Sequence, residues 1–114
     1  MLIQRNQMKT EVKEKMRGGD GCTEITHLVD CANEKNIRML AQVTLQPGSS
    51  IGSHNHDSET EYYIILKGSG TVNDNGTEKP VASGDVMVTG NGASHSISNT
   101  GAVPMVFHAV IVTY

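Results

Sequence analysis

Three histidines and one glutamate have types and spacings that suit a metal site. His54 and His56 lie two residues apart, Glu61 follows them, and His95 lies much further along the chain. Side chains two residues apart on an extended strand point to the same side, so a strand here would place both imidazoles on one face. Imidazole nitrogens beside a carboxylate form a donor set for divalent transition metals. These four residues are the candidate ligands, on the condition that the fold returns His95 to the other three.

The donor set predicts one divalent transition metal ion without naming it. Imidazole suits Fe, Ni, Co, Cu and Zn, and the carboxylate also admits Mn. Four protein ligands around an octahedral ion leave two positions open for water, dioxygen or a chelating substrate. The chemistry to expect is therefore that of a Lewis-acid or oxygen-activating centre that acts on a small molecule.

Neighbouring polar residues are weaker candidates for the site. If Glu61 faces the ion, Tyr63 shares its face of the strand and becomes a candidate pocket hydroxyl. Glu59 competes for the carboxylate position, but we expect it in the loop before the strand. His27 and His108 are expected to be core or rim histidines rather than further ligands. The residues alone assign no catalytic role beyond the pocket candidate.

Short apolar segments separated by turn signals must position these side chains. Apolar alternation or continuous apolar runs predict strands at residues 23–29, 37–45, 62–66, 71–73, 77–81, 86–89 and 103–112. Asn75-Gly76 between two of these segments predicts a type I′ hairpin, and Pro80 places the following strand at an edge or bulge. Turns at this spacing predict an all-β sandwich or barrel. Arg38 lies in a predicted strand and is expected to be solvated, so no arginine is obviously placed to clamp a carboxylate.

The first residues are the least determined by pattern. Glu11 and Lys15 have the spacing of a helical pair, but residues 1–17 carry no sustained apolar period. A short helix and an exchanged edge strand both fit this segment. We expect an N-terminal arm over residues 1–21, a candidate for dimer formation, and a single barrel domain over residues 22–114. Cys22 and Cys31 are expected to be free thiols.

Composition and charge narrow the class of partner. The 114 residues suit one domain with one core, and the hydrophobic fraction of 37% is that of a globular protein. A net charge of -3 and a pI near 5.9 supply no basic field for nucleic acid and no polybasic anchor for an anionic membrane. No apolar run has the length of a spanning helix, and the N-terminal residues lack a signal-peptide core. The sequence therefore predicts a cytoplasmic protein with a small-molecule partner.

Two spacings in the middle of the chain resemble the motifs of the cupin superfamily. The first cupin motif, G-x5-H-x-H-x(3,4)-E-x6-G, is matched at every position by Gly48, His54, His56, Glu61 and Gly68. The second, G-x5-P-x-G-x2-H-x3-N, is matched by Gly84, Gly92, His95 and Asn99, with Gly90 where the family usually has proline. The resemblance covers about half of the chain, residues 47–99.

The resemblance implies a fold, a ligand set and a range of functions. The fold is a jelly-roll barrel, or double-stranded β-helix, in which His54, His56, Glu61 and His95 bind the metal, and similar chains are homodimers. Dioxygenase, isomerase and decarboxylase activities all occur on such folds, so the fold does not choose among them. The alternative is a non-catalytic module that binds or senses a small molecule through the ion. Gly90 in place of proline predicts a more flexible loop ahead of His95.

Overall fold

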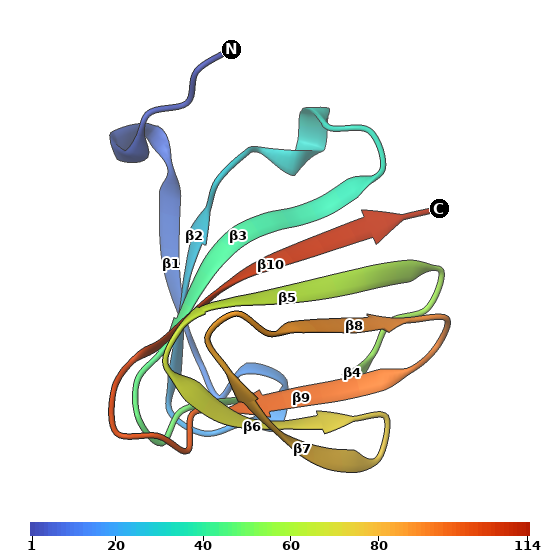
Figure 1. The fold of residues 1–114 in the computed structure, drawn as a ribbon. Helices are drawn as coiled ribbons and strands as arrows, with labels where there is room; N and C mark the ends of the chain where they lie inside the picture. The colour runs from blue at the N-terminus through green and yellow to red at the C-terminus, as the bar shows by residue number, and fades with distance from the viewer.

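Ten strands in two antiparallel sheets make up the fold (Figure 1). The computed structural model describes residues 1–114. The strands are β1 (Lys9–Glu14), β2 (Cys22–His27), β3 (Ile37–Leu45), β4 (Ser50–Asn55), β5 (Glu59–Lys67), β6 (Ser69–Asp74), β7 (Thr77–Ala82), β8 (Val86–Gly90), β9 (Ser94–Ser98) and β10 (Met105–Thr113). Three short 3-10 turns, η1 (Arg5–Gln7), η2 (Met16–Gly18) and η3 (Cys31–Asn33), complete the regular structure. The prediction of an all-β jelly roll is confirmed.

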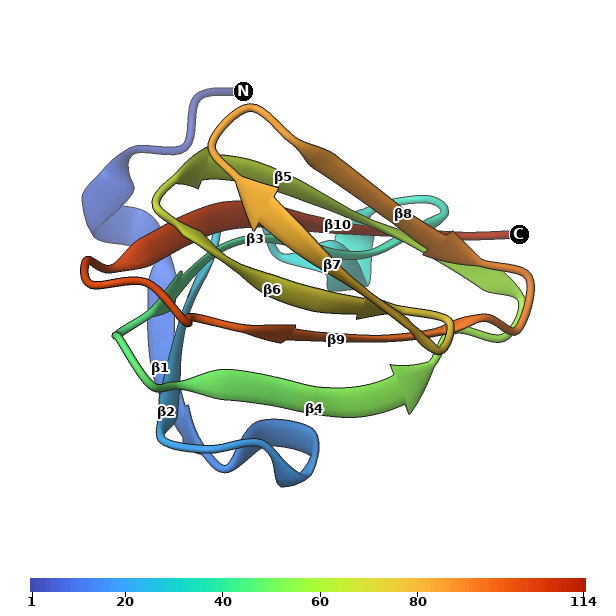
Figure 2. The ribbon, with the colours of Figure 1, turned by 60° about the horizontal axis from the view of Figure 1, so that its bottom comes forward.

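The two sheets enclose one core. One sheet has the strand order β1-β2-β3-β10-β5-β8 and the other β4-β9-β6-β7, as Figure 2 shows from below. Alternate residues of β3, β5 and β10 face inward, which is the period that the sequence predicts for β3. The sequence pattern of β10 did not decide which of its faces points inward, because both faces are apolar. The structure assigns Met105, Phe107 and Ala109 to the core, each 1% exposed or less.

The predicted hairpin joins β6 and β7. Asn75 and Gly76 have φ angles of 49° and 99°, the positive values that a type I′ turn requires. Pro80 lies in β7, which is an edge strand of its sheet, so its missing N–H removes no hydrogen bond between interior strands.

Asn99 stabilises the β9–β10 turn, because its side-chain amide donates to the carbonyls of Leu45 and Val103 at 2.8 Å each.

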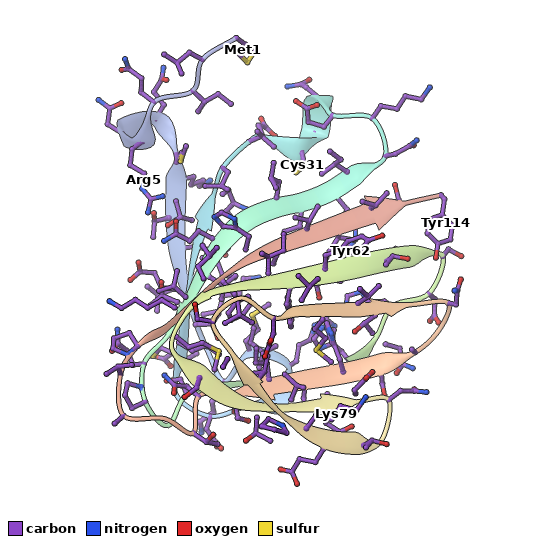
Figure 3. All side chains as sticks on the ribbon, in the orientation of Figure 1. Met1, Arg5, Cys31, Tyr62, Lys79 and Tyr114 are labelled. Carbon is purple, nitrogen blue, oxygen red and sulfur yellow. The ribbon has the colours of Figure 1, made fainter.

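The N-terminal residues form an edge strand. β1 pairs antiparallel with β2 over its whole length, and η2 then packs against β4. Exchange of this strand between protomers, and the division into an arm (1–21) and a barrel (22–114), stay predictions. Both cysteines are free; Cys31 lies on the η3 turn (Figure 3). None of the helical turns has the length and hydropathy of a membrane-spanning helix.

β5 and β8 both reach further than the sequence predicts. Glu59, expected in a loop, is the first residue of β5, and Gly90, expected in the loop before His95, is the last residue of β8. The two ends meet, because Thr60 pairs with Gly90. A Cβ at Gly90 would lie 2.4 Å from Thr60 Oγ1, so the residue is packed rather than loose. Cross-strand pairing, which propensity does not report, extends both strands.

Candidate metal centre

The fold brings His54, His56, Glu61 and His95 to one point between the two sheets. His54 lies on β4, His56 directly follows that strand, Glu61 lies on β5, and His95 lies on β9 beside β4. Pairing of β4 with β9 sets His54 opposite His95, which delivers the distant histidine. One ligand atom from each of the four residues lies within 4.8 Å of all the others.

The distances between these donor atoms suit a six-coordinate metal ion. His95 Nε2 lies 3.0 Å from His56 Nε2, 3.1 Å from His54 Nε2 and 3.0 Å from Glu61 Oε1. His56 Nε2 lies 2.9 Å from Glu61 Oε1, and His54 Nε2 lies 3.9 Å from it. Neighbouring donors of an octahedral ion with bonds of about 2.1 Å lie about 3.0 Å apart, and opposite donors about 4.2 Å apart. The donor set and its spacing therefore fit such an ion.

The second nitrogen of each imidazole is engaged by the protein. His54 Nδ1 donates to the carbonyl of Gly52 at 2.8 Å, and His56 Nδ1 donates to Glu59 Oε2 at 2.5 Å. The hydroxyl of Thr89 lies 2.8 Å from His95 Nδ1. With Nδ1 protonated, each Nε2 carries a lone pair. Three lone pairs and a carboxylate then face one another with no donor between them, which is the arrangement that a cation satisfies.

The neighbouring imidazoles lower the pKa of Glu61 and so keep its carboxylate charged. Burial raises the pKa of Glu61, but the imidazoles of His54, His95 and His56 together outweigh burial and lower the pKa to about 2. Burial lowers the pKa of His95, although Glu61 acts in the opposite direction. The two shifts favour an anionic Glu61 beside a neutral His95, the protonation states that metal binding needs at these two residues.

Glu59 and Arg38 support the group in a way that the sequence did not reveal. Arg38 on β3 donates from Nε and Nη2 to the two carboxylate oxygens of Glu59, at 2.9 and 2.7 Å. The guanidinium lowers the pKa of Glu59, which in turn holds His56. The expectation that Glu59 is a loop residue was wrong, because Glu59 begins β5 and pairs with Thr113 of β10. Arg38 is half exposed, as expected for a solvated side chain, but it also holds Glu59 across β10. The parity of Glu59 with Glu61 was the signal for its position.

A small cavity opens onto three of the four residues, His54, His56 and Glu61. It has a volume of about 50 Å³ and is walled mainly by apolar side chains from both sheets, among them Ile25, Val43, Ile51, Ala109 and Ile111. Tyr63 also lines it, is 2% exposed, and stacks on the ring of His95 with centroids 4.7 Å apart. Burial, with the charge of Glu61, raises the pKa of Tyr63 well above its usual range, so its hydroxyl stays protonated.

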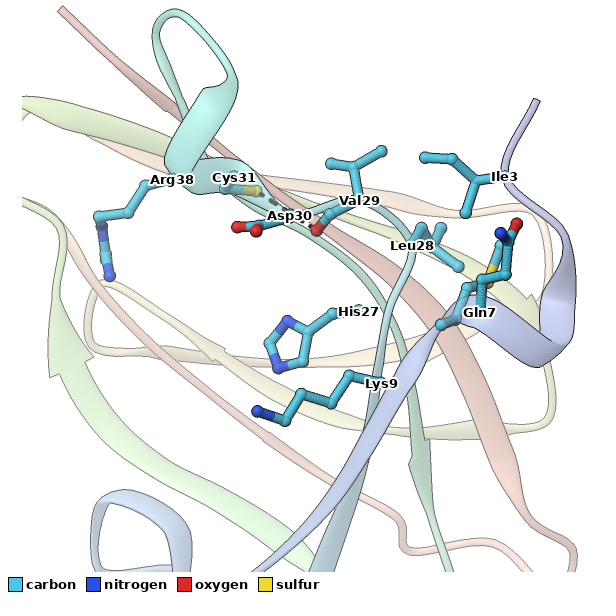
Figure 4. A pocket seen from close by; sticks show the side chains of 10 residues that line it. Ile3, Gln7, Lys9, His27, Leu28, Val29, Asp30, Cys31 and Arg38 are labelled. Atoms are coloured by element: carbon cyan, nitrogen blue, oxygen red, sulfur yellow. Dashed lines mark hydrogen bonds between the residues drawn. The ribbon is translucent and has the colours of Figure 1, made fainter. Parts of the chain in front are cut away.

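A larger hollow of about 480 Å³ lies away from this group, between the N-terminal segment and the β2–β3 connection (Figure 4). None of the four candidate ligands lines it, and Arg38 is the residue that it shares with the smaller cavity. His27, which lines this hollow, lies 2.6 Å from Glu11 through Nε2. His27 is therefore outside the four-residue group, and so is His108, which lies on the outer side of β10.

Comparisons with known proteins agree with this geometry. A family model described as Cupin domain matches residues 41–112. An oxalate-binding protein from Thermotoga maritima is 42% identical over 113 residues, which are 98% of this chain and 93% of that protein. The crystal structure of a predicted oxalate decarboxylase from the same organism covers 100% of both chains with a TM-score of 0.93 and 42% identity.

A more distant structure shows the fold alone. The polyketide cyclase RemF from Streptomyces resistomycificus has a TM-score of 0.76 at 19% identity, over 98% of this chain and 78% of that chain. The same barrel therefore accommodates different chemistry, and the side chains around the cavity must decide what each protein does.

Proposed function

We propose that this chain, which belongs to the cupin family, binds a small dicarboxylate such as oxalate through one divalent transition metal ion. His54, His56, Glu61 and His95 would hold the ion. The observation that carries the proposal is the convergence of these four donors, three of which line a small cavity. The name of the relative at 42% identity supports oxalate as the first ligand to test.

The size of the cavity favours a ligand of few atoms. A volume of about 50 Å³ leaves room for an ion and a ligand of a few heavy atoms, because roughly 10–15 Å³ of such space holds one water. Oxalate is planar and small, and two of its oxygens can occupy neighbouring positions on one ion. When bound, the ion would supply a Lewis-acidic centre that chelates these oxygens. Sugars and polycyclic phenols are too large for this space.

The cavity wall favours binding over proton-transfer chemistry. Apart from His54, His56 and Glu61, its lining is largely apolar, and Glu59 is already shared between Arg38 and His56. No free carboxylate or imidazole is therefore left as a general base. Tyr63 remains as a hydrogen-bond donor, since its pKa is raised.

A second candidate function is decarboxylation of the same ligand, since the solved structure at 42% identity is described as a predicted oxalate decarboxylase. Cleavage of the carbon–carbon bond of oxalate releases carbon dioxide, and the remaining carbon takes up one proton to give formate. Tyr63 is the one hydroxyl on the cavity wall that could deliver that proton. Release of carbon dioxide from oxalate by the metal-loaded protein would establish this activity, and its absence alongside tight binding would leave a binding protein.

The test of the proposed function combines metal analysis with calorimetry. Protein purified without chelator should contain stoichiometric metal, and its Mn²⁺ form should bind oxalate, whereas the EDTA-treated form should not. Replacement of both His54 and His56 by alanine should abolish both properties. His108→Ala is the matched control, because this histidine lies outside the group.

Two results would contradict the proposal. Stoichiometric metal in the His54→Ala, His56→Ala protein would refute the ligand set. Oxalate binding of equal strength with and without metal would refute the role of the ion.

A further inference from the structure

A single unpaired cation lies at the mouth of the metal cavity. Arg17 of η2 lines the cavity together with His54, His56 and Glu61. The chain has three arginines, Arg5, Arg17 and Arg38. Arg38 is held by Glu59, and Arg5 donates to Gln42, but the guanidinium of Arg17 makes no hydrogen bond and no ion pair within the chain. Its donors are free to meet a ligand.

The backbone holds Arg17 at this place in an uncommon conformation. Its φ angle is 55°, in the left-handed region that side chains other than glycine rarely adopt. Lys15, two residues earlier, is also left-handed at 49°. Such conformations are strained and persist where the surroundings determine them, often at functional sites.

Close backbone contact between η2 and β4 supplies those surroundings. A Cβ on Gly52 would lie 2.1 Å from the carbonyl oxygen of Arg17, and one on Gly19 would lie 2.3 Å from that of Ser50. Glycine at both positions lets the two backbones touch. The amide of Ser50 also donates to the carbonyl of Asp20 at 2.8 Å, and Figure 2 shows the turn beside the edge of β4. The turn that presents Arg17 is therefore anchored to the strand that presents His54.

We propose that Arg17 determines specificity by holding the carboxylate oxygens of the ligand that the metal leaves free. This inference rests on the proposed function. A divalent ion and Glu61 together leave one net positive charge in the cavity, and Arg17 adds a second, which matches a dianion. Arg38 cannot take this role without giving up Glu59. A guanidinium also presents paired donors in the geometry of a carboxylate, which a lysine does not.

The role predicts a difference between two ligands of the same shape. Oxalate carries two carboxylates, and oxamate replaces one of them with a neutral amide. Arg17→Gln in the Mn²⁺ form should weaken oxalate binding by roughly tenfold or more, the loss expected for a charged hydrogen bond. Oxamate binding should weaken by less, so the preference for oxalate should shrink. Arg17→Lys should recover part of the affinity, because the charge remains.

Metal affinity and a matched arginine separate this role from a structural one. Calorimetry with oxalate and oxamate should be run beside measurements of Mn²⁺ affinity and thermal unfolding, both of which Arg17→Gln should leave near the wild-type value. Arg5→Gln is the control, because Arg5 lies on η1, away from the cavity (Figure 3). Its oxalate affinity should not change.

The outcomes distinguish the inference from the function on which it rests. If the wild-type protein binds oxalate and Arg17→Gln binds it equally well, or loses both ligands in the same proportion, the inference is wrong and the proposed function stands. If the wild-type Mn²⁺ protein does not bind oxalate, both are wrong.

Discussion

At the scale of single residues, the second nitrogen of each candidate ligand decides how well the first can bind a metal. The three Nδ1 atoms face three different partners, the carbonyl of Gly52, the carboxylate of Glu59 and the hydroxyl of Thr89. A carboxylate partner raises the basicity of the imidazole more than a neutral partner does. His56 is therefore the ligand whose strength depends most on the residues behind it.

The Glu59 carboxylate should accordingly control metal affinity. Glu59→Gln keeps the size of the side chain but removes the charge that orients His56, and we expect a loss of roughly tenfold to hundredfold in metal affinity. Competition with a chelator of known affinity measures the change. Glu34→Gln, at an exposed position before β3, should have no effect. Equal affinities for Glu59→Gln and the wild type would rule out this support.

The pH dependence of the metal-free protein should follow His95. Its folded-state pKa is lowered by burial, so below the ordinary value of 6.5 the unfolded chain takes up a proton more readily than the folded one. Stability should therefore fall as the pH drops from 7.5 towards 5.5. The pKa of Glu61 is lowered from its ordinary value of 4.5 to about 2, so the stability that this carboxylate contributes is lost only when the pH falls below about 4.5.

Thermal unfolding of EDTA-treated protein between pH 8 and 5 measures this dependence. The midpoint should decline in that window, and His95→Gln should make the decline shallower. A wild-type midpoint that stays constant or rises on acidification is the contrary result.

At the scale of elements, the contact between η2 and β4 links the cavity mouth to the metal ligands. The contact depends on the missing side chain at Gly52, whose added Cβ would meet backbone rather than a movable side chain. The same residue accepts the hydrogen bond from His54 through its carbonyl. One strand position therefore serves both the turn that presents Arg17 and the orientation of a ligand.

Gly52→Ala should displace the turn from the strand. Overpacking of this kind costs about 1–3 kcal/mol in the free energy of unfolding, and oxalate binding should weaken along with it. Chemical denaturation of the two proteins gives the difference. Ser53→Ala, the exposed neighbour on the same strand, should change the free energy of unfolding by far less. If the two variants were equally stable, the close approach would not matter.

At the scale of the whole molecule, the outer side of the larger sheet carries an apolar patch centred on β5 and β8. Leu40, Val110, Tyr62 and Val88 lie opposite one another in a row across four strands, and Ile64 and Val86 form the next row at the sheet edge. Val86 and Val88 are each 56% exposed. We propose that this face is the self-complementary surface of a homodimer, in which each copy covers the same patch on the other.

Charge placed on this face should prevent the association. Val86→Lys combined with Val88→Lys should convert the dimer to a monomer, because two charges opposite their symmetry mates are costly to bury. Light scattering at micromolar concentration reports the mass. Val103→Lys is the control, since Val103 is 51% exposed in the β9–β10 turn. A monomeric wild-type protein would exclude the dimer.

Much of the fold was determined by the sequence, because its signals are local. The alternation in β3, the continuous apolar run in β5, the Asn75-Gly76 hairpin and the edge position of Pro80 all follow from neighbouring residues. The spacing of the two motifs likewise named the four residues that the fold brings together. These features depend on periods of two residues and on backbone dihedral angles, which a single chain displays without its tertiary contacts.

The tertiary structure decided which residues from distant segments of the chain come together in the barrel. The inward face of β10, the carboxylate of Glu59 behind His56, and the approach of Arg17 to the cavity all depend on segments far apart in the chain. The N-terminal residues carried no apolar period, so nothing local indicated that their turn would lie over the metal ligands. Long-range strand pairing and backbone contact between two glycines brought Arg17 there, and neither leaves a periodic signal in the sequence.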